Sequence, residues 1–193
     1  MDAFPGTASS GYYDPYRKLR AVKISPGEYC VVKSHSLLVT VLGSCITACL
    51  YDIATGVGGM NQFLVANIHE DLPLNQRMVN IANAAMDKFI RHLVDSGASV
   101  ERLKAKVFGG GHILNSLKRD NVGARSTRFL NEYLMDRKIP ILAADVLDIY
   151  PRKIYFFPQT GEVLVKKLKD MKNETLLERE RRYADRLLGG MLS

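Results

Sequence analysis

The chain lacks several features that would point to a membrane or an exported protein. No apolar run among its 193 residues approaches the ~20 needed to cross a bilayer, so we expect no membrane insertion. Residues 1–16 show no basic segment followed by an apolar stretch, so no signal peptide is expected. Cysteine is scarce and odd in number, with Cys30, Cys45 and Cys49. Together these absences predict a cytoplasmic protein with reduced thiols.

The chain also lacks any recognisable nucleic-acid motif, although its net charge is +7. Much of the positive charge falls late, between Lys166 and Arg186, where acidic residues are interleaved with it. Nucleic acid is therefore not an expected partner. This pattern favours the solvated face of a charged helix. A surface that docks an acidic protein partner remains the alternative, because basic patches steer such encounters.

Hydrophobic residues make up 47% of the chain, which suits one compact domain. We predict a flexible tail at residues 1–18, an α+β domain at 19–170 and a charged C-terminal helix at 171–193. Apolar spacing of three and four residues predicts helices at 78–93 and 125–137, with Gly97 and Pro140 as end signals. The short early strands are spaced like hairpins, which favours antiparallel neighbours. The strands are predicted at residues 19–24, 29–33, 37–42, 45–51, 60–66, 103–108, 141–146, 153–157 and 162–168.

A possible nucleophile is found at Gly43, Ser44 and Cys45, where a tight corner enters an apolar strand. Glycine permits the sharp backbone path. The backbone N–H groups of Ser44 and Cys45 are then placed to hold the oxygen that becomes negative when a thiolate attacks a carbonyl. On this interpretation we expect the Cys45 thiol at an exposed bend. The alternative is a small buried hydrophobe, as we expect for Cys30 and Cys49. Neither a metal nor a cofactor is indicated, because the spacing of Cys45 and Cys49 on a strand is not a usual ligand spacing.

Several segments together resemble one known family, the chemoreceptor glutamine deamidases called CheD. The match runs in order through roughly residues 25–170. It rests on residues 40–45 (Thr-Val-Leu-Gly-Ser-Cys), 49–52 (Cys-Leu-Tyr-Asp), 58–61 (Gly-Gly-Met-Asn), 105–110 (Ala-Lys-Val-Phe-Gly-Gly), 122–125 (Val-Gly-Ala-Arg) and 157–163 (Phe-Pro-Gln-Thr-Gly-Glu-Val).

The resemblance implies a layered α/β/β sandwich of mostly antiparallel and mixed strands, with helices on one side. It implies a cytoplasmic hydrolase of bacterial chemotaxis that converts receptor glutamines to glutamate and ammonia through a cysteine thioester. The implied partners are the cytoplasmic helices of chemoreceptors and a CheC-type phosphatase. The family's catalytic set is Cys, His and Thr, and it maps here onto Cys45 as the cysteine nucleophile and onto Thr40.

The third member of that set is missing, because Gln62 stands where the family has histidine. Glutamine cannot take a proton from a thiol near neutral pH. His112, which closes the glycine run 109–111, is the best candidate for a substitute base among the four histidines. That run is expected to be a loop of close backbone approach rather than a phosphate site, since no Lys-Ser/Thr pair follows it.

Two further positions depart from the family pattern. Ser126 replaces an asparagine, and Leu147 and Asp148 replace two glycines. Gln62 therefore leaves three functions open. The first is a working glutamine deamidase. The second is a catalytically impaired CheD-like module that docks receptors or a CheC-type phosphatase. The third is a thiol hydrolase acting on another amide or ester.

Overall fold

The computed structural model describes residues 6–8, 10–33, 35–66, 76–113, 122–168 and 174–189. Its elements, in chain order, are β1 (Gly6–Thr7), β2 (Gly11–Asp14), β3 (Leu19–Lys23), β4 (Glu28–Val32), β5 (Ser36–Leu42), β6 (Ile46–Asp52), β7 (Val57–Asn61), α1 (Gln76–Asp95), a short 3₁₀ helix (Val100–Arg102), β8 (Lys104–Gly109), α2 (Val122–Asp136), β9 (Ile141–Val146), β10 (Arg152–Phe157), β11 (Glu162–Lys167) and α3 (Glu174–Gly189).

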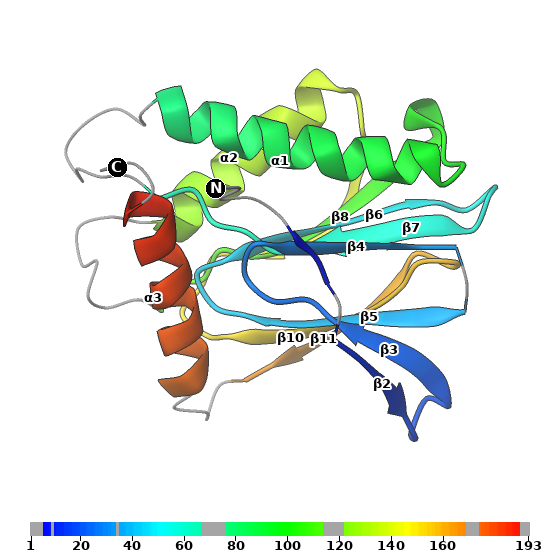
Figure 1. Cartoon of the computed structure of the whole chain (residues 1–193), viewed down its shortest axis with the longest axis horizontal. Coiled ribbons are helices and arrows are strands. Elements are labelled where there is room, and N and C mark those ends of the chain that lie inside the picture. The colour runs from blue at the N-terminus through cyan, green and yellow to red at the C-terminus, as the bar shows by residue number, and fades with distance from the viewer. Residues whose placement is uncertain are drawn as a thin grey trace.

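The strands form two sheets that pack face to face, and α1 and α2 lie over the outer face of one of them (Figure 1). The covered sheet has the order β1-β4-β7-β6-β8-β9, and the second has the order β11-β10-β5-β3-β2. Every residue of β6 is buried, as expected for a strand with packing on both faces. The α+β class and the layered α/β/β arrangement are confirmed.

Apolar periodicity explains why α1 covers the first sheet. Its buried face carries Met78, Ala82, Phe89 and Leu93 at helical spacing. Phe89 approaches the sheet where Gly59 of β7 lies, since a Cβ on Gly59 would stand 2.7 Å from the Phe89 ring. β7 therefore begins before the predicted start of this strand at residue 60, and glycine is required at position 59 because a side chain there has no room.

The chain crosses from one sheet to the other at residues 43–45. β5 belongs to the second sheet and β6 to the helix-covered sheet, so the Gly43 corner sits at one end of the sandwich. The predicted antiparallel pairing is wrong for β3 and β5, which are parallel. They are parallel because β4, the strand between them in the chain, pairs in the other sheet.

The N-terminal segment differs from the flexible tail predicted for residues 1–18. Gly6–Thr7 pairs with β4, and Gly11–Asp14 pairs with β3. β1 and β4 lie far apart in the chain, so no local period could indicate their pairing. β2 and β3 form a local hairpin across residues 15–18, but the Gly-Tyr-Tyr-Asp sequence of β2 lacks the apolar alternation that indicates a strand. Backbone hydrogen bonds to an existing sheet edge supply the order that the glycine-rich sequence does not.

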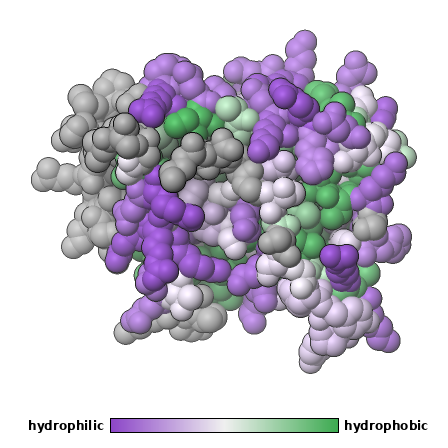
Figure 2. Space-filling view, in the orientation of Figure 1, coloured by the Kyte–Doolittle hydropathy of each residue, from purple (hydrophilic) through white to green (hydrophobic). Residues whose placement is uncertain are grey.

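The C-terminal helix α3 stands across one end of the two sheets and not on a face (Figure 1). Its outward side is strongly hydrophilic (Figure 2), and Arg181, Arg182 and Asp185 are exposed there. Its inward side buries Leu176, Glu180, Tyr183, Ala184 and Leu187. No helix among the described residues has the length and apolar character needed to cross a membrane.

Candidate active site

Three segments of the sandwich bring the predicted site residues together at the end that α3 covers. Thr40 lies in β5, Cys45 immediately precedes β6, and Gln62 immediately follows β7. All three are buried. The Thr40 Oγ1 atom lies 2.6 Å from Gln62 Oε1 and 2.9 Å from the Ile24 carbonyl oxygen. Gln62 also interacts with the Cys45 thiol. The structure therefore brings together Thr40, Cys45 and Gln62, the three residues that the resemblance predicts as the catalytic positions.

The backbone at the corner forms a cluster of three N–H donors. Gly43 N and Ser44 N each lie 2.7 Å from an oxygen of the Glu180 carboxyl group, and Cys45 N lies 3.2 Å from Glu180 Oε1. Both carboxyl oxygens accept hydrogen bonds, as in an ionised carboxylate. The corner thus presents backbone N–H donors to a carboxyl group beside the thiol, as an oxyanion site requires. Gly43 N and Cys45 N converge on Oε1, whereas Ser44 N bonds Oε2, so the two predicted donors, Ser44 and Cys45, hold different oxygens of this group.

Close backbone packing around Gly43 holds this corner in place. Gly110 N donates to the Cys45 carbonyl oxygen at 2.8 Å, and Gly111 N donates to the Gly43 carbonyl oxygen at 2.7 Å. Gly109 has a φ of +106°, and a Cβ there would lie 2.3 Å from the Cys45 oxygen. The glycine run is therefore a loop of close backbone approach, and no side chain could replace Gly109 without moving the corner.

The Cys45 thiol is fully buried, so the expectation of an exposed bend is wrong for this structure. The side chain belongs to an apolar cluster that includes Leu42 and Phe108 on the sheets and Tyr183 and Leu187 on α3. The physical reason is α3. Its buried face closes the end of the sandwich, and Glu180 fills the space in front of the three N–H donors.

Burial raises the pKa of the Cys45 thiol well above its usual value, and the carboxyl group of Glu180 raises it further. Hydrogen bonding by Gln62 acts in the opposite direction, although its Nε2 atom has no partner of ordinary geometry among the described residues. Burial also raises the pKa of Glu180, while the backbone N–H groups of the corner lower it. With α3 in place, the thiol is therefore held in its protonated, unreactive form.

His112 does not reach the thiol. Its side chain is exposed, whereas Cys45 is fully buried, and its backbone N–H donates to the Asp148 carbonyl oxygen. His35 is also exposed, and His92 packs edge-on against Tyr29. His69 lies outside the described residues. The hypothesis that His112 replaces the missing base therefore has no support in the geometry, because the loop presents the backbone of Gly111 to the corner and the imidazole to solvent.

Glu180 is the site residue that sequence reasoning missed. The charge pattern of residues 166–186 suggested a solvated face, and the helical spacing of leucine and alanine predicts a stripe of Leu177, Ala184, Leu187 and Leu188. Ala184 and Leu187 are buried as this stripe predicts, but the rest of the buried face is formed by Leu176, Glu180 and Tyr183. A glutamate within an otherwise regular apolar stripe is the signal that could have revealed it.

The positions at which this sequence departs from the pattern of the resemblance make backbone contacts. Leu147 and Asp148 have φ of 64° and 72°, in the left-handed region that favours glycine. Leu147 N donates to the Gly109 carbonyl oxygen, so this turn supports the glycine loop. Ser126 is buried and accepts a hydrogen bond from Val65 N at 2.8 Å. Both positions thus act through the backbone around the site.

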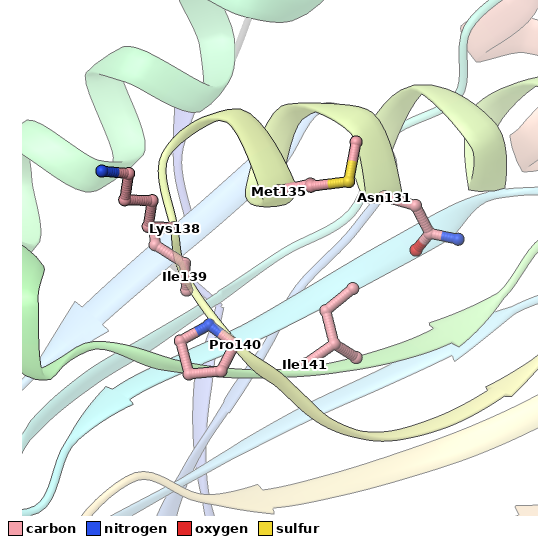
Figure 3. Close-up of a pocket in the computed structure, with 6 residues that line it drawn as sticks. All are labelled: Asn131, Met135, Lys138, Ile139, Pro140 and Ile141. Atoms are coloured by element: carbon pink, nitrogen blue, oxygen red, sulfur yellow. The ribbon is translucent and has the colours of Figure 1, made fainter.

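A separate hollow of about 370 Å³ lies where α2 meets β9 (Figure 3). Asn131 and Met135 line it from α2, and Ile141 lines it from the start of β9. Its only ionisable lining residue is Lys138, and it contains neither thiol nor imidazole. It is therefore distinct from the Cys45 site, whose thiol does not line it.

Comparison with known proteins places the chain among chemotaxis proteins. The family model described as CheD chemotactic sensory transduction matches residues 70–167. A probable chemoreceptor glutamine deamidase CheD of Shewanella oneidensis is 45% identical over 177 residues, covering 91% of this chain and 86% of that protein. A protein of the same description from Dechloromonas aromatica is 47% identical over 184 residues, covering 94% and 90%. A third, from Methylobacillus flagellatus, is 43% identical over 183 residues, covering 93% and 90%.

Proposed function

The chain belongs to the CheD family, and on that premise we propose that it is a glutamine deamidase acting on chemoreceptors. The relatives that it matches over most of its length carry that description. They support a hydrolase that removes the side-chain amide of glutamine. The dependence on Cys45 and the activity of this chain are our own proposals, argued from the site.

The chemistry follows from a thiol beside converging N–H donors. The Cys45 thiolate attacks the side-chain carbonyl carbon of a receptor glutamine, and the N–H groups of Ser44 and Cys45 hold the oxygen as it becomes negative. Collapse of this intermediate, with a proton added to the nitrogen, releases ammonia and leaves a thioester. Water then cleaves the thioester, yielding a glutamate side chain and the free thiol.

The observation that carries this proposal is the carboxyl group already bound at the corner. Glutamate is the product of the proposed reaction, and the corner binds a glutamate side chain through three backbone N–H groups beside the thiol. The isosteric carboxamide of glutamine can place its oxygen where Glu180 Oε1 accepts from Gly43 N and Cys45 N. Its NH2 group, which only donates, then lies where Oε2 accepts from Ser44 N, so the Ser44 N–H group loses that acceptor until the product carboxylate forms. The geometry thus supports attack on a side-chain amide more than on a larger ester.

Gln62 sets an expectation about rate. The amide takes the position of the family's histidine next to Thr40, but it cannot accept the thiol proton. General bases typically contribute about 10²–10⁴-fold. We therefore propose a slow deamidase, with Gln62 and Thr40 positioning the thiol. Cytoplasmic localisation and binding to a CheC-type phosphatase remain parts of the proposal.

Mass spectrometry of receptor fragments tests the proposed function. Fragments containing target glutamines are incubated with the full chain, with Cys45→Ala and with Cys49→Ala. Cys49 is a matched control, because it is an equally buried thiol in β6 away from the corner. We expect amide-to-carboxyl conversion with the unmodified chain and with Cys49→Ala, and none with Cys45→Ala. Conversion that survives Cys45→Ala contradicts the thioester route. Absence of conversion by all three leaves the impaired docking module as the better function.

A further inference from the structure

We propose that α3 is a built-in product mimic, which occupies the docking surface of the receptor helix and presents Glu180 where the product glutamate lies. The identity of the substrate in this inference rests on the proposed function. The first test below measures access to the Cys45 thiol and does not require deamidase activity. The partner that the covered surface fits is an amphipathic helix with a glutamine in the middle of its apolar face.

The pose of Glu180 is the one expected of a bound product side chain. Its carboxyl group contacts all three backbone donors of the corner, with distances of 2.7, 2.7 and 3.2 Å. Glutamate and glutamine have side chains of the same length, so a glutamine at this helix position brings its amide group to the same place. Gly43 makes this approach possible, because a Cβ there would lie 3.0 Å from Glu180 Oε2.

Apolar side chains surround that carboxyl group. Leu176 and Leu187 flank Glu180 on the buried face of α3, one turn before it and two turns after it. Tyr183 packs against the Gly27 turn, where a Cβ would stand 2.7 Å from the Tyr183 ring. Gly27 N in turn donates to the Gln62 carbonyl oxygen. The surface thus recognises a helix through apolar side chains on both sides of one buried carboxyl or carboxamide group.

Helix α3 and a substrate cannot occupy the site together. The oxyanion of the intermediate needs the same Ser44 and Cys45 N–H groups that hold Glu180, and the docked helix leaves the thiol fully buried. Turnover therefore requires α3 to leave. A helix pairs with no strand, so its departure breaks side-chain packing and the Glu180 contacts but no sheet ladder.

A rival role for Glu180 is that of the missing base, since its carboxyl group interacts with the Cys45 thiol. The geometry favours the product mimic, because a carboxyl group bound to the oxyanion donors is in the place of the reacting substrate. The two roles predict opposite effects of removing it. If Glu180 is a product mimic, removing its carboxyl group makes turnover faster. If Glu180 is the base, removing the carboxyl group abolishes turnover.

The first test measures access to the thiol. The rate of Cys45 alkylation by iodoacetamide is compared in the full chain, Glu180→Ala and Glu178→Ala. Glu178 is a matched control, because it lies on the exposed side of the same helix and pairs with Arg182. We expect alkylation to rise at least about tenfold in Glu180→Ala, since hydrogen bonds to a charged group have been removed from the docked state. The control should behave like the unmodified chain. Equal rates in all three overturn the proposal.

The same variants are then tested on a receptor fragment. Faster deamidation by Glu180→Ala supports the product mimic, and loss of deamidation in a folded protein assigns Glu180 the role of base and overturns it. If no variant deamidates the fragment while alkylation still rises, the proposed function fails and the occupancy by α3 stands.

The last test asks whether the pose is productive. In Glu180→Gln the helix itself presents an amide to Cys45. We expect conversion of position 180 to a carboxyl group, detected by mass spectrometry of the peptide that contains it. No conversion is expected when Cys45→Ala is combined with Glu180→Gln. If the receptor fragment is deamidated but position 180 stays an amide, α3 only covers the site, and its carboxyl group does not lie where the product carboxylate lies. That result overturns the product mimic.

Discussion

Helices α1 and α3 both bury one face, but the two faces differ in kind. The face of α1 is wholly apolar, with Phe89 against Tyr29 at a ring distance of 5.6 Å. The face of α3 has Glu180 at its centre, held by backbone N–H groups of the corner. An apolar face is stabilised in one place only, by the sheet that it covers. Burying a carboxyl group costs free energy unless its hydrogen bonds are complete. The docked position of α3 therefore depends on the backbone N–H groups of the corner, for which a substrate can compete.

A buried site is therefore not necessarily an inactive one, because the helix that covers it can be held by contacts that a substrate also makes. The burial of Cys45 depends on the helix whose polar centre matches the chemistry of the corner. The burial of Cys49, in contrast, depends on β6 lying between packed layers, and burial raises the pKa of its thiol. The two thiols are thus equally buried, but Cys45 can become exposed when a helix moves, whereas Cys49 is covered by the sheet layers themselves.

The largest change in the free energy of unfolding is expected from a substitution in the buried face of α1, and a smaller one from a substitution in the buried face of α3. Phe89→Ala removes a fully buried ring and should lower the free energy of unfolding by about 3–5 kcal/mol. Glu180→Ala should lower it by only about 1.4 kcal/mol, the free energy that corresponds to a tenfold rise in exposure of the thiol, because the lost hydrogen bonds are partly offset by the removal of a buried carboxyl group. Urea denaturation followed by circular dichroism measures both. Equal losses would show that α3 is as integral to the fold as α1.

The next effect asks whether the site under α3 can work faster. Gln62→His restores a base beside Thr40 and should raise receptor deamidation by about 10²-fold or more. The increase should be larger still when Gln62→His is combined with Glu180→Ala, since both the base and access are then supplied. Ammonia release from a receptor fragment is the measurement. An unchanged rate, with an active starting protein, means that another group is the base.

A smaller effect is expected from pH, which should change the docking of α3 but not the packing of α1. The pKa of Glu180 is raised in the docked state above its usual 4.5, chiefly by burial, so the docked state holds its proton more tightly. Docking is therefore strongest below pH 4.5 and weakens as pH rises through the raised value. The raised pKa values of Cys45 and Tyr183 add to this loss at alkaline pH, while Arg179 opposes it for Cys45. Methyl NMR signals of Leu187 should shift toward the undocked state, and those of Leu93 in α1 should not.

The smallest effect lies beside the corner and outside both helices. Leu147→Gly should stabilise the protein by about 1 kcal/mol, because glycine adopts the left-handed conformation of Leu147 without its steric cost. Thermal unfolding measures the change, with Leu142→Gly in the edge strand β9 as a control that should destabilise. No gain would mean that the turn is not strained.

Periodicity predicted α1 and α2 well, because each packs through a regular apolar stripe that is local in sequence. It predicted the ends of β7 poorly, because Gly58 and Gly59 belong to the strand through their pairing with β4 and β6, which no apolar period indicates. The candidate site could be named from motif order as Thr40, Cys45, Ser44 and Gln62. His112 was misjudged, because proximity in a loop does not determine which way its side chain points.

Ordered motifs and local patterns in the amino-acid chain were enough to predict the family, the layered class of the fold and the residues of the corner. Only the tertiary structure decided that the thiol is closed off and that Glu180 occupies the oxyanion donors. The reason is separation: residues 43–45 and 180 lie far apart in the chain, and no local pattern encodes which carboxyl group a cluster of backbone N–H groups will meet.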